Sequence, residues 1–167
     1  MRSSGFVDVV EVDWGEEIAW RDWRLTFLPM QHWSRRLSQP ENSTLWGGWL
    51  IDTGRGRILF AGDSGWFGGF AEIGRRFAPI DLALLPIGAY EPRWFMRVAH
   101  MDPAEAVRAC VALGARRMVP THWGTFDLSD EAVDEPPREL ERALALPEFS
   151  GLGERVRMLK VGEAIEL

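Results

Sequence analysis

The stretch RILFAGDSGWFGGFAEIGRRFAPIDLALLPIG, residues 57–88, sets the fold of this chain. It opens with a short apolar strand over residues 57–62 and closes with an almost continuous apolar run over residues 80–88. Such a run is typical of a strand that is buried on both faces. Between the two, residues 67–77 have the spacing of a short helix. The stretch therefore predicts a strand, a helix and a second strand, and it indicates an α/β architecture.

The half of the chain before this stretch is rich in predicted strands. Short strand-like runs cover residues 6–12, 23–30 and 45–53. The last of these leads through the turn sequence GRGR into the strand at 57–62, so the two are expected to form a hairpin.

The half after the stretch alternates helices and strands. A helix is predicted over residues 102–114, because Asp102 stands at its N-cap, Pro103 at its first position and Gly114 just past its end. Three further elements are predicted after it. They are a strand over 116–124, a helix over 135–146 and a terminal hairpin over 155–167 around Val161 and Gly162. No internal repeat or low-complexity linker divides the chain, so one domain over 1–167 is expected.

Composition narrows the class of protein. With 167 residues, of which 46% are hydrophobic and 26% charged, the chain is long enough for one ordinary core. A net charge of -6 and the lack of a basic block argue against a nucleic-acid surface. Cys110 is the only cysteine, which excludes an internal disulfide and fits a reducing compartment. No apolar run reaches the roughly 18 residues of a membrane span. We therefore expect a cytoplasmic protein, or one that is peripheral at the membrane.

Three polar residues follow predicted strands directly. His32 comes after the strand at 23–30, Asp63 after that at 57–62, and His122 after RRMVP in the strand at 116–124. Imidazole nitrogen and carboxylate oxygen are the usual non-sulfur ligands of zinc, so the three form a candidate metal shell. The alternatives are a hydrogen-bonded core histidine for His32, a turn residue for Asp63 and a cap for His122.

Six blocks of sequence in a fixed order resemble the C-terminal half of the N-acylphosphatidylethanolamine-hydrolysing phospholipase D family, within the metallo-β-lactamase superfamily. The blocks are QHWSRR, LWGGWLI, FAGDSG, DLALLPIGAYEPRWFM, HMDPAEAV and THWGTF. The resemblance covers roughly residues 24–146. It implies half of an αββα sandwich, with one mixed sheet and helices on one face. It also implies two zinc ions and hydrolysis of a phospholipid phosphodiester to an N-acylethanolamine and a phosphatidic acid.

The resemblance also implies roles for individual residues. His32 matches a ligand of the first metal, Asp63 the carboxylate that bridges both metals, and His122 a ligand of the second. A bridging carboxylate suits cations about 3.5 to 4 Å apart. His100 resembles an active-site histidine outside the metal shell, where it would contact the phosphate or supply a proton to the leaving oxygen. A plain residue at a helix N-terminus is the alternative for His100.

Four residues in AYEPRWFMR are further candidates for contact with the substrate. They are Tyr90, Glu91, Arg93 and Arg97. An arginine can hold a phosphate through two parallel hydrogen bonds. An ordinary structural salt bridge is an equal alternative for either arginine.

One departure from the superfamily pattern affects the whole functional prediction. The motif HxHxDH, which supplies four of the seven expected ligands, is absent, and all three histidines of the chain are already assigned. A lone chain is therefore expected to bind zinc poorly and to be inactive. It is either a fragment of a longer enzyme, one subunit of a split enzyme, or a non-catalytic lipid-binding remnant. Another hydrolase of this type, acting on a lactone, a thioester or a different phosphodiester, is the alternative enzyme.

A half sandwich should leave one apolar sheet face without its partner. We expect that face to be built from Leu50, Ile58, Phe60, Leu82, Leu84 and Val119. Such a face favours self-association, or binding of the polypeptide that carries the missing half.

Overall fold

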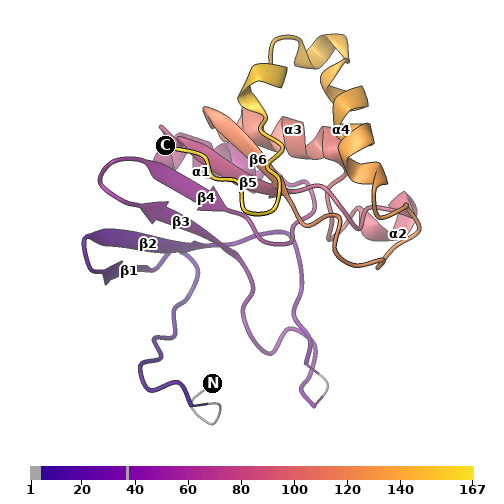
Figure 1. Ribbon diagram of the computed structural model, residues 1–167. Helices are drawn as coiled ribbons and strands as arrows, with labels where there is room; N and C mark the ends of the chain where they lie inside the picture. The colour runs from indigo at the N-terminus through magenta and orange to yellow at the C-terminus, as the bar shows by residue number, and fades with distance from the viewer. Residues whose placement is uncertain (1–4, 37) are drawn as a thin grey trace.

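The computed structural model describes residues 5–36 and 38–167, which form a six-stranded sheet with helices (Figure 1). The strands are β1 (Glu17–Trp20), β2 (Trp23–Leu28), β3 (Gly48–Asp52), β4 (Arg57–Phe60), β5 (Leu82–Pro86) and β6 (Arg117–Thr121). The helices are α1 (Gly69–Phe77), α2 (Arg93–Met96), α3 (Pro103–Ala112) and α4 (Glu135–Leu144), with short 3-10 turns at Pro147–Phe149 and Gly153–Arg155.

The sheet is mixed, as the sequence predicts, and its strand order follows the chain from β1 to β6. The first four strands form an antiparallel meander, whereas β4, β5 and β6 are parallel. Parallel neighbours need long crossovers, and the chain provides them with α1 between β4 and β5, and α2 and α3 between β5 and β6. Since β2 also runs in the direction of β4, four strands end at the same edge of the sheet.

Helix α3 shows how local signals set the crossover. The Asp102 carboxylate accepts a hydrogen bond from the Glu105 backbone N–H at 2.8 Å, and the Glu105 carboxylate accepts one from the Asp102 N–H at 3.2 Å. This is a complete capping box. Pro103 fills the first turn, and Gly114 stops the helix with a φ of +63°, which favours glycine. The predicted helix over 102–114 is confirmed.

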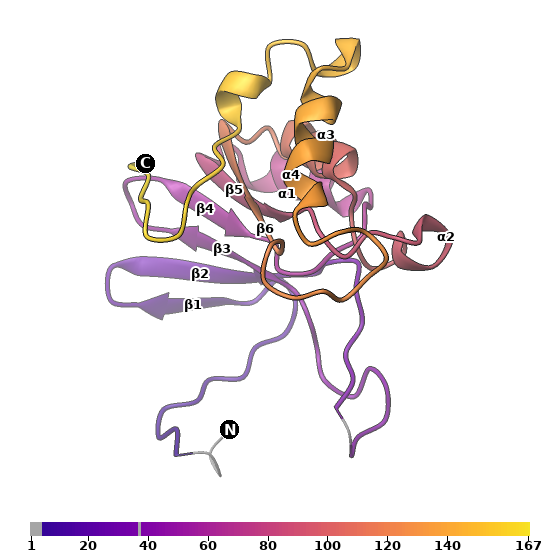
Figure 2. The same cartoon turned by 45° about the vertical axis from the view of Figure 1, so that its right-hand side comes forward.

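The core lies between the sheet and the helices, which cover a single face (Figures 1 and 2). Leu59, Ala83, Leu85 and Met118 point to this face and are fully buried. Leu50 lies opposite Leu59 in the β3–β4 ladder, and it belongs to the same buried cluster. The expectation that Leu50 forms part of the outer face is therefore wrong, because it stands one residue out of phase with the outer side chains.

The outer face carries the other five expected residues. The registers place Ile58 beside Leu82, and they align Phe60, Leu84 and Val119 across three strands. Phe60 is 43% exposed, whereas Leu82 and Val119 are buried. The C-terminal segment crosses this side of the sheet (Figure 1), where the Arg117 guanidinium donates a hydrogen bond to the Glu166 carbonyl. The chain thus covers part of its own outer face and leaves the part around Phe60 open.

Two predicted strand regions are wrong. Residues 6–12 form no strand; they run away from the sheet and are largely exposed (Figure 1). The edge is taken instead by β1, whose tight connection to β2 has Arg21 at a φ of +54°. At the other end, residues 155–167 contain the expected turn at Val161 and Gly162 but no hairpin ladder. Val156 makes an isolated parallel bridge with Met118 instead, so this segment lies along β6 and does not fold back on itself as a hairpin.

The helices of the described chain are short. Among residues 5–36 and 38–167, none combines the length and the apolar character of a membrane span.

Candidate metal centre

The predicted ligands meet at one edge of the sheet. His32, Asp63 and His122 follow β2, β4 and β6, and these strands all point their carboxyl ends to the same side. Loops that follow strands of one direction lie close together, which is why residues so far apart in sequence converge.

The Asp63 carboxylate lies between two imidazole rings. Its Oδ1 is 3.3 Å from Nε2 of His122, and its Oδ2 is 4.0 Å from Nε2 of His32. Both distances fall within the roughly 3 to 7 Å expected for ligands of a shared metal site. The predicted convergence of the three side chains is confirmed, while their role as metal ligands stays a prediction.

The ring of His32 is fixed from behind. Its Nδ1 lies 2.8 Å from the Trp33 carbonyl oxygen. The His32 and Trp33 rings are stacked, with an angle of 4° between their planes and 5.8 Å between their centroids. A proton on Nδ1 satisfies that carbonyl and leaves Nε2 as the lone-pair nitrogen. Nε2 is buried and has no hydrogen-bond partner among the described residues. The ring is therefore oriented as a metal ligand would be.

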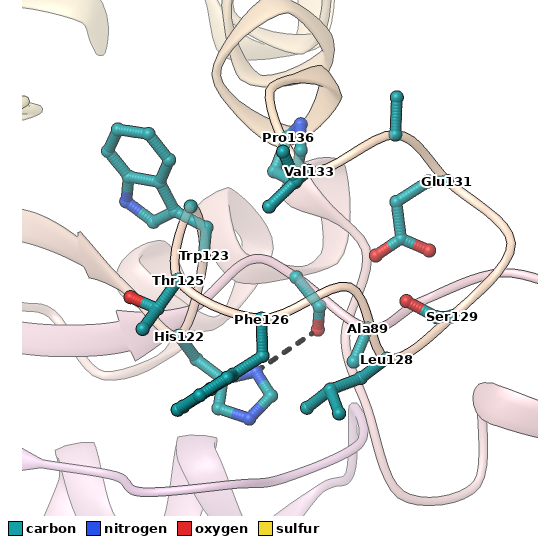
Figure 3. Close-up of a pocket in the computed structure, with 13 residues that line it drawn as sticks. Ala89, His122, Trp123, Thr125, Phe126, Leu128, Ser129, Glu131, Val133 and Pro136 are labelled. Atoms are coloured by element: carbon teal, nitrogen blue, oxygen red, sulfur yellow. Dashed lines mark hydrogen bonds between the residues drawn. The ribbon is translucent and has the colours of Figure 1, made fainter.

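The loop that carries His122 depends on a close approach to Gly88. His122 has a φ of +59°, which is rare for a residue with a side chain. Its Nδ1 lies 3.4 Å from the Gly88 carbonyl oxygen, the contact drawn as a dashed line in Figure 3. A Cβ on Gly88 would stand 2.2 Å from the His122 carbonyl oxygen. Glycine is thus required here, and the sequence signal was its place directly after the buried strand.

Buried Ser64 joins the loops of His32 and Asp63. Its hydroxyl accepts a hydrogen bond from the Gln31 N–H at 3.1 Å, and the Gly65 N–H donates to the Gln31 carbonyl at 2.9 Å. The Ser64 carbonyl also accepts from the Met101 N–H at 3.0 Å. Three segments of the site are therefore tied together at one residue. Sequence reasoning did not single out Ser64, since a serine in a GDSG turn gives no separate signal.

His100 lies against both metal-ligand candidates. Its ring centroid is 5.2 Å from that of His32 and 5.4 Å from that of His122. One ligand atom each of His32, Asp63 and His100 lie within 4.8 Å of one another. His100 therefore lies close to the candidate metal site, where the Met101–Ser64 hydrogen bond joins its segment to the Asp63 loop, and its expected place outside the metal shell stays a prediction. Burial first, and then the nearby His32, lower the pKa of His100 to about 4.

These side chains fit a bound metal of the zinc type. Nε2 of His32 and Nδ1 of His100 are buried without hydrogen-bond partners among the described residues, a costly state for a polar atom. A carboxylate lies beside them, so the donors are the nitrogen and oxygen atoms that zinc accepts. An ion bound by His32 and Asp63 would remove the cost of burying the unpaired Nε2 of His32.

The predicted substrate-binding residues take different places. Arg93 forms a salt bridge with Glu105 at 2.6 Å, which is the alternative named for it above. Its guanidinium also donates a hydrogen bond to the His100 carbonyl at 3.0 Å, so Arg93 helps to hold the His100 segment. Tyr90 is buried, and burial with Glu131 nearby raises the pKa of its phenol. Arg97 is exposed. The substrate contacts of these residues stay predictions.

A mixed sheet with helices on one face, and a histidine and carboxylate cluster at its strand ends, defines an α/β protein of the metallo-β-lactamase type. The chain belongs to the family described as beta-lactamase superfamily domain, whose profile matches residues 1–123.

Relatives agree with this assignment. The chain is 38% identical over 142 residues to the Caenorhabditis elegans N-acyl-phosphatidylethanolamine-hydrolyzing phospholipase D 1, covering 82% of this chain and 40% of the relative. It is 35% identical over 170 residues to the mitochondrial Saccharomyces cerevisiae protein named N-acyl-phosphatidylethanolamine-hydrolyzing phospholipase D. That match covers 98% of this chain and 36% of the relative. The chain thus spans about two fifths of the length of these curated relatives.

A solved structure shows the same fold. The metallo hydrolase Igni18 from Ignicoccus hospitalis superposes with a TM-score of 0.67 at 22% identity, over 98% of this chain and 63% of that one. The resemblance to the phospholipase D family and the predicted fold class are confirmed.

Proposed function

We propose that this chain forms one half of the two-metal site of a hydrolase that cleaves the phosphodiester of an N-acylphosphatidylethanolamine. The products would be an N-acylethanolamine and a phosphatidic acid. The observation that carries this proposal is the Asp63 carboxylate, which turns one oxygen to His32 and the other to His122. Relatives named for this reaction, at 35% and 38% identity, support the choice of substrate.

His32, Asp63 and His122 would hold the metals, with zinc as the ion that suits their donor atoms. Zinc bound there would supply Lewis acidity and a nucleophilic water near neutral pH. The whole chain has three histidines, too few for two complete zinc shells. We therefore propose that another polypeptide segment, carrying HxHxDH, provides the remaining ligands.

His100 would act on the phosphate directly. Its lowered pKa keeps the imidazole neutral near pH 7, so it is suited to donate one hydrogen bond to a phosphate oxygen rather than to act as a cation. A proton handed to the leaving oxygen is the second role open to that N–H.

The lipid substrate also implies contact with a membrane surface. Helix α2 places Trp94 and Phe95 in solvent, with Trp94 80% exposed. Aromatic side chains of this kind prefer the interface between lipid and water. We propose that α2 touches the bilayer as a peripheral contact.

The test is reconstitution. The chain is co-expressed with a polypeptide that carries HxHxDH, and zinc content and hydrolysis of N-acylphosphatidylethanolamine are measured together. Both should appear in the pair, and both should fall in Asp63→Asn and His122→Ala, whereas exposed Asp22→Asn serves as the matched control. Zinc uptake with cleavage of lactones or thioesters but not of the phospholipid would select the alternative hydrolase. Zinc-free, inactive pairs would contradict the metal centre.

A further inference from the structure

A pocket lies beside the metal centre, on the far side of the His122 ring from Asp63. Its cavity volume is about 230 Å³, and the loop that follows β6, residues 122–136, forms most of its wall (Figure 3). The Nε2 edge of His122 faces Asp63, while its Nδ1 edge faces Gly88 on the pocket side. One imidazole ring thus borders both the candidate metal centre and this pocket.

The pocket wall is mostly apolar. Its apolar side chains are those of Ala89, Trp123, Phe126, Leu128, Ala132, Val133 and Pro136. Besides His122, the wall has three polar side chains. They are the hydroxyls of Thr125 and Ser129 and the carboxylate of Glu131. An apolar wall with few polar groups is the usual composition of a site for a small organic ligand.

The Glu131 carboxylate in the pocket wall already has hydrogen-bond donors within the chain. Glu131 accepts a hydrogen bond from the Tyr90 N–H at 3.1 Å on one oxygen and from the Glu91 N–H at 2.9 Å on the other. Its charge is therefore used to hold the loop, so it gives little reason to expect a cationic ligand. The apolar side chains remain to select what binds.

The pocket is preformed by the backbone. The Asp130 N–H donates to the Glu91 carbonyl at 3.2 Å, which adds to the two Glu131 contacts and pins the loop to the segment after β5. At its end, the Glu135 N–H donates to the Ala132 carbonyl at 2.8 Å, where α4 begins. The loop is therefore held at Asp130 and Glu131, so this part of the pocket wall is in place before a ligand binds.

We infer that this pocket binds an alkyl or acyl segment of the substrate, the segment attached to the group that is held at the metal centre. This assignment rests on the proposed function. The volume lies below the roughly 300–1,000 Å³ of a site for a drug-sized ligand, so the pocket takes a short apolar segment and not a whole lipid. Residues 122–136 thereby determine specificity for the apolar part of the substrate.

A series of n-alkylphosphonates tests the inference. The phosphonate group is expected to bind at the metal centre. The alkyl chain, lengthened from methyl to butyl, is expected to enter the pocket. Binding to the reconstituted pair, in which a second polypeptide supplies HxHxDH, is measured by calorimetry in the presence of zinc. Each added methylene that enters the pocket should tighten binding about fourfold, and butylphosphonate should bind roughly 60-fold more tightly than methylphosphonate.

Two variants and a control separate the pocket from the metal centre. Ala132→Trp fills the pocket and should abolish the dependence on chain length while leaving methylphosphonate affinity unchanged. Leu128→Ala, at an exposed position, removes part of the wall and should weaken the dependence without a folding cost. Ala71→Trp, on the exposed side of α1, is the matched control and should behave like the wild type.

The outcomes distinguish the two proposals. Methylphosphonate that binds with no dependence on chain length, or a dependence that survives in Ala132→Trp, overturns the pocket inference and leaves the metal centre standing. Methylphosphonate that fails to bind the wild type with zinc refutes the proposed function, and the pocket inference falls with it.

Discussion

Gly88→Ala should disable the metal centre without touching a ligand. The new Cβ would stand 2.2 Å from the His122 carbonyl oxygen, whereas real Cβ contacts essentially never fall below 3.0 Å. The backbone at His122 must therefore move by roughly 1 Å, against a φ of +59° that is already unfavourable. Forced crowding of this kind costs about 1–3 kcal/mol of folding free energy. Because it displaces a ligand, zinc affinity should fall about 10- to 100-fold, as for loss of a supporting contact at other metal sites.

The assay is a zinc titration of the reconstituted pair by calorimetry, with a thermal melt of the metal-free chain beside it. Gly68→Ala is the matched control, because its φ is -63° and a Cβ there meets no atom within 4 Å. It should leave both measurements unchanged. A Gly88→Ala protein that binds zinc and melts like the wild type would refute the idea that this close approach positions His122.

Three further predictions follow from the site, the outer face and the β3–β4 hairpin. In the reconstituted enzyme, His100→Ala should lower turnover with zinc content near the wild-type value by mass spectrometry; a zinc loss equal to that of His122→Ala would make His100 a ligand. The purified chain should associate through the open outer face in light scattering, and Phe60→Lys should reduce that association; a monomeric wild type contradicts this. A hydrogen bond from the Gly54 N–H, together with Arg57 and Arg24, lowers the pKa of Asp52. The ionised carboxylate therefore stabilises the folded chain above about pH 4. That contribution is lost as the pH falls through the lowered pKa. Asp52→Asn should flatten that loss in melts at pH 2–6, and an unchanged profile would exclude Asp52.

The convergence of the metal ligands could be predicted because it follows from strand direction. His32, Asp63 and His122 each come directly after an apolar run, and strands that run the same way must end at the same edge. The helix over 102–114 could be predicted for a similar reason, since its cap and stop signals are local. Features that depend on a few adjacent residues are visible in the sequence.

Features that depend on distant partners could not be predicted. Residues 6–12 alternate partly, yet the strand at the sheet edge is β1, because its tight turn brings it back onto β2. Leu50 was assigned to the outer face by its apolar character, whereas its face is set by pairing with Leu59. The closeness of His100 to Asp63 depends on the Met101–Ser64 hydrogen bond, which joins segments far apart in sequence.

The two faces of the sheet separate folding from metal binding. The core that holds β2, β4 and β6 in place lies on the helix-covered face, and it is built from fully buried residues such as Leu59, Leu85 and Met118. The outer face around Phe60 adds little to that core, because it is largely open. His32, Asp63 and His122 therefore follow strands whose fully buried core lies on the helix-covered face. A partner on the outer face would raise metal affinity by adding ligands, and not by creating the arrangement of the three already present.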